Sequence, residues 1–160
     1  MQHSEPVGEV LDLFGPQIQL LTALSDEDDG YCLFGGTLPA GAVVPLHSHA
    51  ERETFYILEG ELKGLRQDRW LTLAGGDVLD IPGGVKHAFR NVSAAPVYLL
   101  FVTTMRLGRF FCEVGRPADT VPSPGPPTSA DLQRFFEISR ASGYWLGSAE
   151  DNAAVGISLG

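Results

Sequence analysis

The chain has 160 residues, a length typical of one domain that can bury its own core. Its 11 Lys and Arg against 20 Asp and Glu give a net charge of −9, which argues against nucleic acids and membrane surfaces as partners. The N-terminal segment MQHSEPVGEV has neither a basic start nor an apolar stretch, so we expect no signal peptide and a cytoplasmic protein. Cys32 and Cys112 lack metal or redox spacing, so we expect buried thiols, although the sequence leaves a disulfide open.

The N-terminal part of the chain predicts short strands separated by turns. Apolar or alternating residues cover 10–13, 18–24 and 31–37, and Gly15-Pro16 and the acidic run 25–30 interrupt them. We interpret the acidic run as a solvated turn, because Asp favours turn conformations and the ligand spacing of an EF-hand calcium loop is missing.

The strands become evenly spaced from Ala42 to Thr104. Turn residues such as Gly60, Gly75-Gly76 and Pro82-Gly83-Gly84 separate them. Many short strands at regular spacing, with no competing helical period, predict an all-β sandwich or barrel. The expected strands cover 43–46, 54–59, 61–66, 70–73, 78–81, 87–91 and 97–104.

The C-terminal part differs in composition. Residues 116–128 carry five prolines and predict an extended, semi-rigid connector. Residues 130–141 then predict a helix, which places Leu132, Phe135 and Phe136 on one face that we expect to dock on the barrel or on a partner subunit. Residues 151–160 are small and weakly patterned, so we expect them to be loosely ordered.

Four side chains form a candidate metal site: His47, His49, Glu53 and His87. Three imidazoles and one carboxylate are a complete ligand set for a divalent transition metal. His47 and His49 are two residues apart, so in a strand both point to the same side. A single inward histidine is more often an ordinary core residue, but burying Glu53 beside three imidazoles would be costly without a cation.

A longer pattern surrounds these residues. The stretch GAVVPLHSHAERETFYILEG at 41–60 resembles the first cupin motif, and GDVLDIPGGVKHAFRN at 76–91 resembles the second. The resemblance covers residues 35–104 and implies an all-β cupin jelly-roll β-barrel, to which the predicted helix adds a short C-terminal helix. The tail, with LGRFF at 107–111 and YWLG at 144–147, is similar to the extension of quercetin-dioxygenase-like cupins.

The resemblance implies that His47, His49, Glu53 and His87 bind one divalent ion, which could be Fe, Mn, Ni, Co, Cu or Zn. Four protein ligands leave about two positions of an octahedral ion open for substrate or dioxygen. Glu53 would be either a simple fourth ligand or also a general base. The expected function is that of a dioxygenase-like oxidoreductase acting on a small aromatic or polyketide-like molecule. The alternatives are a non-redox isomerase or cyclase and a non-enzymatic binding or sensing module.

We expect three regions: 1–34 with N-terminal strands that are free for dimer formation, 35–106 as the barrel core, and 107–160 as the connector and helical tail. The resemblance implies a homodimer that pairs through sheet faces or N-terminal strands. An apolar substrate cavity would be walled by Phe34, Phe55, Phe89, Phe101 and Met105.

Overall fold

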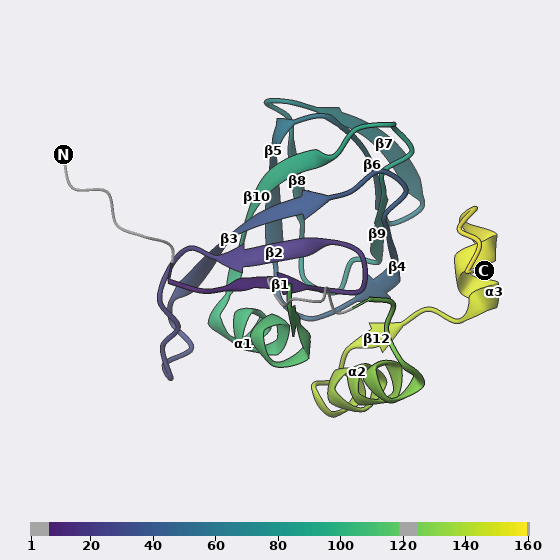
Figure 1. Ribbon diagram of the computed structural model, residues 1–160. Helices are drawn as coiled ribbons and strands as arrows, with labels where there is room; N and C mark the ends of the chain where they lie inside the picture. The colour runs from purple at the N-terminus through teal and green to yellow at the C-terminus, as the bar shows by residue number, and fades with distance from the viewer. Residues whose placement is uncertain (1–6, 119–124, 160) are drawn as a thin grey trace.

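Two antiparallel β-sheets that face each other form the body of the protein, as a computed structural model describes it for residues 7–118 and 125–159 (Figure 1). The seven-stranded sheet has the order β11 (Arg116–Pro117), β1 (Val10–Asp12), β2 (Gln17–Leu20), β3 (Tyr31–Leu38), β10 (Val97–Thr104), β5 (Glu53–Glu59) and β8 (Val78–Ile81). The five-stranded sheet has the order β12 (Trp145–Leu146), β4 (Val43–Ser48), β9 (His87–Arg90), β6 (Glu61–Arg66) and β7 (Arg69–Ala74). The predicted all-β jelly roll is confirmed.

The core lies between the two sheets because strand residues alternate between an inner and an outer face. In β3 and β10 every second residue is buried. Phe34 and Ile57 of the larger sheet join Leu62 and Leu73 of the smaller sheet in one apolar cluster. Each such fully buried side chain stabilises the fold by about 1.5–3 kcal/mol, so the alternating pattern of the central strands determines the sandwich.

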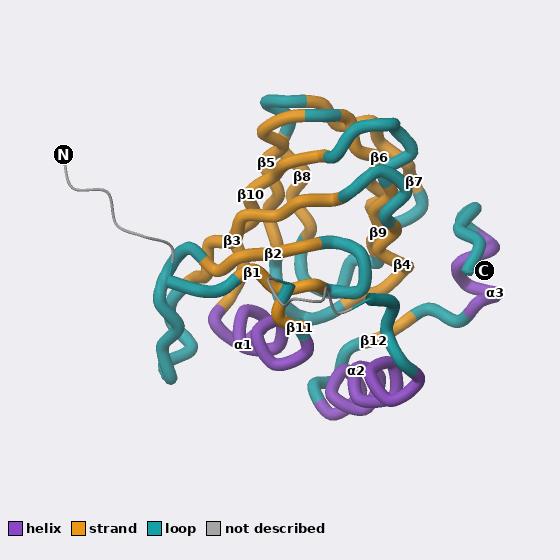
Figure 2. Tube along the Cα trace, in the orientation of Figure 1, coloured by secondary structure: helices purple, strands orange, loops and turns teal. Residues whose placement is uncertain are grey.

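The described part of the chain has three helices, all after β10, and Figure 2 shows α1 (Met105–Val114) and α2 (Ser129–Ala141) at one end of the sheets. The expected helix at 130–141 is confirmed as α2, which begins with a capping box between Thr128 and Asp131. The first helix, α1, was not predicted. The expectation of a loose end at 151–160 was wrong, because α3 (Ala149–Ala154) forms and Ile157 is buried. Part of the expected proline-rich connector, 119–124, lies outside the described residues.

Asn152 fastens α3 to β4. Its side-chain oxygen accepts from the Leu46 amide at 2.9 Å, and its nitrogen donates to the carbonyl oxygens of Gly147 and Ser148 at 3.2 and 2.9 Å. The side chain is completely buried. Water cannot reach these buried polar groups, so the side chain of Asn152 supplies the hydrogen bonds that they need.

The Asn152→Ala variant should therefore unfold about 2–4 kcal/mol more easily, because it leaves buried main-chain groups without partners. Urea unfolding followed by circular dichroism measures this. The control is Glu150→Ala on the exposed side of the same helix, which should change stability by less than about 0.5 kcal/mol. Equal losses in the two variants would contradict the role of Asn152.

Both cysteines are free thiols; Cys32 is buried, and Cys112 is half-buried. The sulfur of Cys32 lies 3.6 Å from that of Met105. Within residues 7–118 and 125–159, none of the helices has the length and hydrophobicity needed to cross a lipid bilayer.

Candidate metal centre

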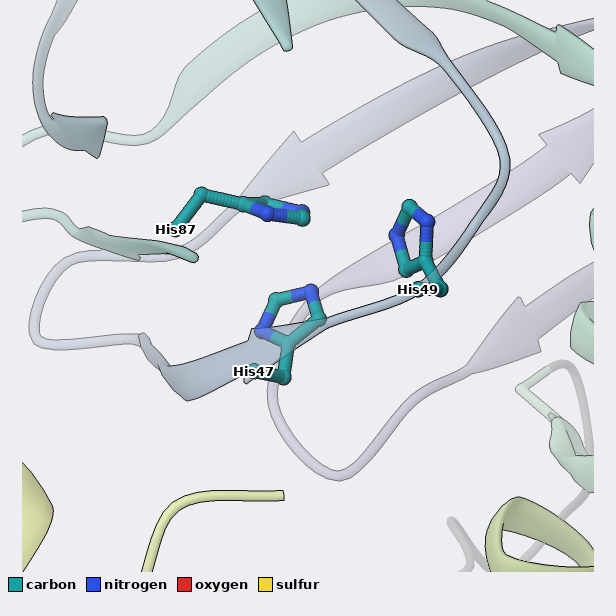
Figure 3. Close-up of side chains that lie close together, drawn as sticks. All are labelled: His47, His49 and His87. Atoms are coloured by element: carbon teal, nitrogen blue, oxygen red, sulfur yellow. The ribbon is translucent and has the colours of Figure 1, made fainter. Parts of the chain in front are cut away.

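The predicted ligand residues come from three strands and meet at one end of the sandwich. His47 lies on β4 directly opposite His87, the first residue of β9, and His49 follows the end of β4. Glu53 is the first residue of β5 in the other sheet. Figure 3 shows the three imidazole rings turned toward a common space. One nitrogen from each ring lies within 4.8 Å of the others, a grouping compatible with a single metal ion.

The tautomer of each ring is fixed by the main chain. Nδ1 of His47 lies 2.7 Å from the carbonyl oxygen of Pro45, Nδ1 of His49 lies 2.9 Å from that of Glu51, and Nδ1 of His87 lies 2.8 Å from that of Val85. A carbonyl oxygen can only accept, so Nδ1 carries the proton in all three rings. A neutral ring then has a lone pair on Nε2, the form in which imidazole binds a metal.

Glu53 closes the group from the opposite sheet. One of its carboxylate oxygens, Oε2, lies 3.1 Å from Nε2 of His49 and 3.2 Å from Nε2 of His87. Two lone-pair atoms at this separation repel each other unless a proton or a metal ion lies between them. Two ligand atoms that are each about 2.1 Å from one ion, and at right angles, are about 3.0 Å apart. These residues therefore fit a divalent transition metal.

Burial and the neighbouring charges set the protonation of the group. Desolvation and the adjacent His87 lower the pKa of His47 to about 3, so this ring is neutral at pH 7. Burial alone would raise the pKa of Glu53, but the contacts with His49 and His87 outweigh it and lower the value to about 2. Burial opposes protonation of His49, yet the contact with Glu53 raises the pKa of His49 overall. The carboxylate is thus ionised and ready to neutralise part of a cation's charge.

The Pro82-Gly83-Gly84 turn holds the ligand-bearing loop in place. The amide of Gly84 donates to the carbonyl oxygen of His49 at 2.7 Å. Gly83 packs so closely on Ala50 that a Cβ atom at this position would overlap the Ala50 carbonyl oxygen. Only glycine has no side chain to fill this space, so Gly83 allows the turn to lie directly against the residues that connect His49 to Glu53.

An apolar cavity of about 350 Å³ opens from the ligand cluster. His47, His49 and Glu53 line one side of it, and no lysine or arginine is among the described residues that form its wall. Of the expected wall residues, Phe55, Phe89 and Phe101 line the cavity. The structure places the two others elsewhere: Phe34 stacks behind Phe101 with ring centroids 4.8 Å apart, and Met105 packs on Cys32.

Much of the wall comes from segments that the sequence motifs do not include. Phe14, in the turn between β1 and β2, stands edge-on to Phe135 of α2 at 5.4 Å, and Phe110 of α1 contacts Tyr144 at 4.8 Å. Tyr144 also lies 5.7 Å from the ring of His49. These aromatic residues were visible in the sequence, but nothing local indicated that they line the same cavity as the predicted ligand residues.

Residues 36–103 match the family model of the cupin domain. This part of the chain therefore has the sequence pattern and the fold of a cupin domain. It contains all four predicted ligand residues, whereas Phe14, Phe110 and Tyr144 lie outside it. No curated protein matches the chain significantly in sequence.

Solved structures share the cupin fold. The polyketide cyclase RemF from Streptomyces resistomycificus superposes with a TM-score of 0.57 at 19% identity, over 66% of this chain and 80% of its own. An RmlC-like cupin from Shewanella frigidimarina gives 0.53 at 22% identity, over 65% and 94%. The DMSP lyase DddQ from Ruegeria pomeroyi gives 0.53 at 22% identity, over 61% and 56%. At these identities the likeness concerns the fold alone.

Proposed function

We propose that the protein is a metal-dependent oxygenase that acts on a small apolar molecule with an enol or phenol oxygen. The observation that carries this proposal is the convergence of three Nε2 atoms and one carboxylate oxygen beside an apolar cavity. His47, His49, Glu53 and His87 would hold one divalent ion. When bound, such an ion supplies a Lewis acid for a substrate oxygen and, if it is redox-active, electrons for dioxygen.

The cavity wall supports an apolar, aromatic or polyketide-like substrate. Phenyl rings and aliphatic side chains form most of the wall, and such surfaces bind planar apolar molecules without unpaired polar groups. The missing lysine and arginine side chains on the described wall disfavour sugar phosphates and other substrates with a second anionic group. The resemblance of the tail to quercetin-dioxygenase-like cupins agrees with this class.

The protein residues would bind and orient the substrate rather than perform chemistry alone. Phe55, Phe89 and Phe101 would pack on the apolar body of the substrate and exclude water from its reacting end. Glu53, if it leaves the ion, would accept the proton of the enol or phenol at its carboxylate oxygen. Burial and the Glu51 carboxylate raise the pKa of Tyr144, so its hydroxyl stays protonated. This hydroxyl donates to Glu51, and its oxygen can accept a hydrogen bond from the substrate.

A second candidate is a non-redox isomerase or cyclase. The observation that favours it is that the ionised carboxylate of Glu53 and the hydroxyl of Tyr144 line the same cavity, where Glu53 could take up a substrate proton without any oxidant. In that case the bound ion would act only as a Lewis acid.

The test is elemental analysis of the purified protein followed by an oxygen-uptake screen. We expect about one transition-metal ion per chain, and oxygen uptake that starts when an apolar phenol or β-diketone is added. Equal turnover in air and under argon would support the isomerase or cyclase instead. Bound metal without turnover of any phenol or β-diketone tested would favour a binding or sensing module. A purified protein that contains no metal would refute the proposal.

A further inference from the structure

The cupin domain contains a second buried carboxylate beside the ligand cluster. Glu51 lies between His49 and Glu53 in the sequence and is only 7% exposed. Its oxygen Oε1 accepts from Nη1 of Arg106 at 2.8 Å and from the hydroxyl of Tyr144 at 3.2 Å. A buried carboxylate is costly unless charged or polar partners surround it. Its position therefore calls for an explanation beyond packing.

The second oxygen of Glu51, Oε2, faces the metal ligand. It has no hydrogen-bond partner among the described residues and lies 3.8 Å from Nδ1 of His49. The same Nδ1 donates to the main-chain carbonyl oxygen of Glu51 at 2.9 Å. A carboxylate near the Nδ1–H group of a ligating histidine orients the ring and makes Nε2 a stronger donor to the metal.

The other partners of Glu51 belong to the C-terminal segment outside the matched domain. Nη2 of Arg106 donates to the carbonyl oxygen of Ser142, where α2 ends, at 2.8 Å. Tyr144, two residues later, lines the cavity. The Glu51 carboxylate thus contacts α1, the cavity wall and His49, and Arg106 extends this network to the end of α2.

We propose that Glu51 is a positioning residue that ties the metal ligand His49 to the cavity wall through Arg106 and Tyr144. This inference rests on the proposed metal-dependent function, because it assigns to Glu51 a role toward the bound ion. Its consequence is that the C-terminal segment, although it supplies no ligand, stabilises the geometry of the metal site. The position of the Tyr144 hydroxyl in the cavity is fixed by the same carboxylate.

The test compares Glu51→Gln with the parent protein by cobalt binding. Gln keeps the shape but loses the charge, and we expect cobalt(II) affinity, measured by competition with a chelator, to fall about 10–100-fold. The visible absorption of the bound cobalt should shift, because the His49 donor changes. Hydrogen exchange of residues 142–147 should become faster, since a neutral amide oxygen holds Arg106 and the Tyr144 hydroxyl less strongly than a carboxylate does.

The matched control is Asp80→Asn. Asp80 also binds a guanidinium, that of the neighbouring Arg52, at 2.9 and 2.7 Å, but it does not approach a ligand histidine. The Asp80→Asn variant should leave both the cobalt affinity and the hydrogen exchange of residues 142–147 unchanged. If both variants lose affinity equally, or if Glu51→Gln speeds exchange without altering cobalt binding, Glu51 is only a structural brace and the proposal is wrong.

Milder variants keep the test decisive if Glu51→Gln does not fold. Tyr144→Phe and Arg106→Gln each remove one partner of Oε1, and we expect smaller losses of cobalt affinity in the same direction. Unchanged affinity in both would overturn the proposal. A parent protein that binds no cobalt at all would instead refute the proposed function, and the role of Glu51 with it.

Discussion

The His87→Ala variant should lose the metal. His87 is completely buried, its Nδ1 is fixed by Val85, and its Nε2 lies 3.2 Å from Glu53. Removing an outer contact of a ligand already costs about 10–100-fold in metal affinity, so the loss of the ligand itself should exceed about 100-fold. The metal content measured by elemental analysis after metal loading and dialysis should fall from about one ion per chain in the parent to a small fraction of an ion in the variant.

Thermal unfolding gives an independent measure of the same loss. Free metal at one hundred times its Kd stabilises the parent by about 2.7 kcal/mol, which corresponds to a rise in Tm of about 5–10 °C for a chain of this size. The rise should be absent in His87→Ala. The control is His3→Ala, which alters the one histidine outside the motifs and should keep the full rise. A His87→Ala protein that binds and is stabilised like the parent would show that the ligand assignment is wrong.

The Gly83→Ala variant should damage the site without touching a ligand. The added methyl group would overlap the main-chain oxygen of Ala50, and a main-chain atom cannot move aside as a flexible side chain can. Ala50 follows His49 directly, so a shift of this loop displaces the ligand. We expect a loss of about 2–3 kcal/mol in unfolding free energy, together with about tenfold weaker metal binding.

The Gly76→Ala variant is the control for Gly83→Ala, because it introduces backbone strain without crowding. Gly76 has a φ of 93°, but a Cβ atom at this position would meet nothing within 4 Å. Alanine there should cost about 1–2 kcal/mol through the left-handed conformation alone and leave metal affinity unchanged. Chemical unfolding and cobalt titration of both variants test this. If Gly83→Ala binds cobalt as tightly as Gly76→Ala does, the turn does not position the ligand loop.

The sequence predicted the strands well because their signals are local. The strands expected at 61–66, 78–81 and 97–104 have the observed bounds. Turn glycines and prolines separate them, and alternating residues fill them, so local patterns alone indicate where these strands begin and end. The four proposed ligands also come together in the structure, because the motif spacing fixes their places on β4, directly after it, and at the starts of β5 and β9.

Helix α1 was missed for a physical reason. It follows β10 without a break, its start is marked only by the side chain of Thr104, and Gly108 lies in its middle, where glycine normally weakens a helix. Gly108 is needed because a Cβ atom would collide with the sulfur of Cys32. A contact with a residue of β3 thus overrides the local preference, and no local pattern reveals it.

The wall of the cavity was only partly predictable. Strand alternation places Phe34 and Phe101 on the same inner side, but it does not tell which ring lies next to the cavity and which lies behind it. The contact between Glu51 and Tyr144 joins residues that are 93 positions apart. Such pairings arise from the docking of α1 and α2, and a single sequence does not encode them in any short spacing.

Two parts of the chain form the cavity, and this division has a consequence for evolution. The four proposed ligands belong to the cupin domain, whereas Phe14, Phe110 and Tyr144 are contributed by segments on either side of it. Substitutions in these flanking segments can reshape the cavity for a small molecule without altering the four proposed ligands. Selection, or a protein engineer, could therefore change which molecule fits the cavity by altering the flanking segments and leaving the cupin domain untouched.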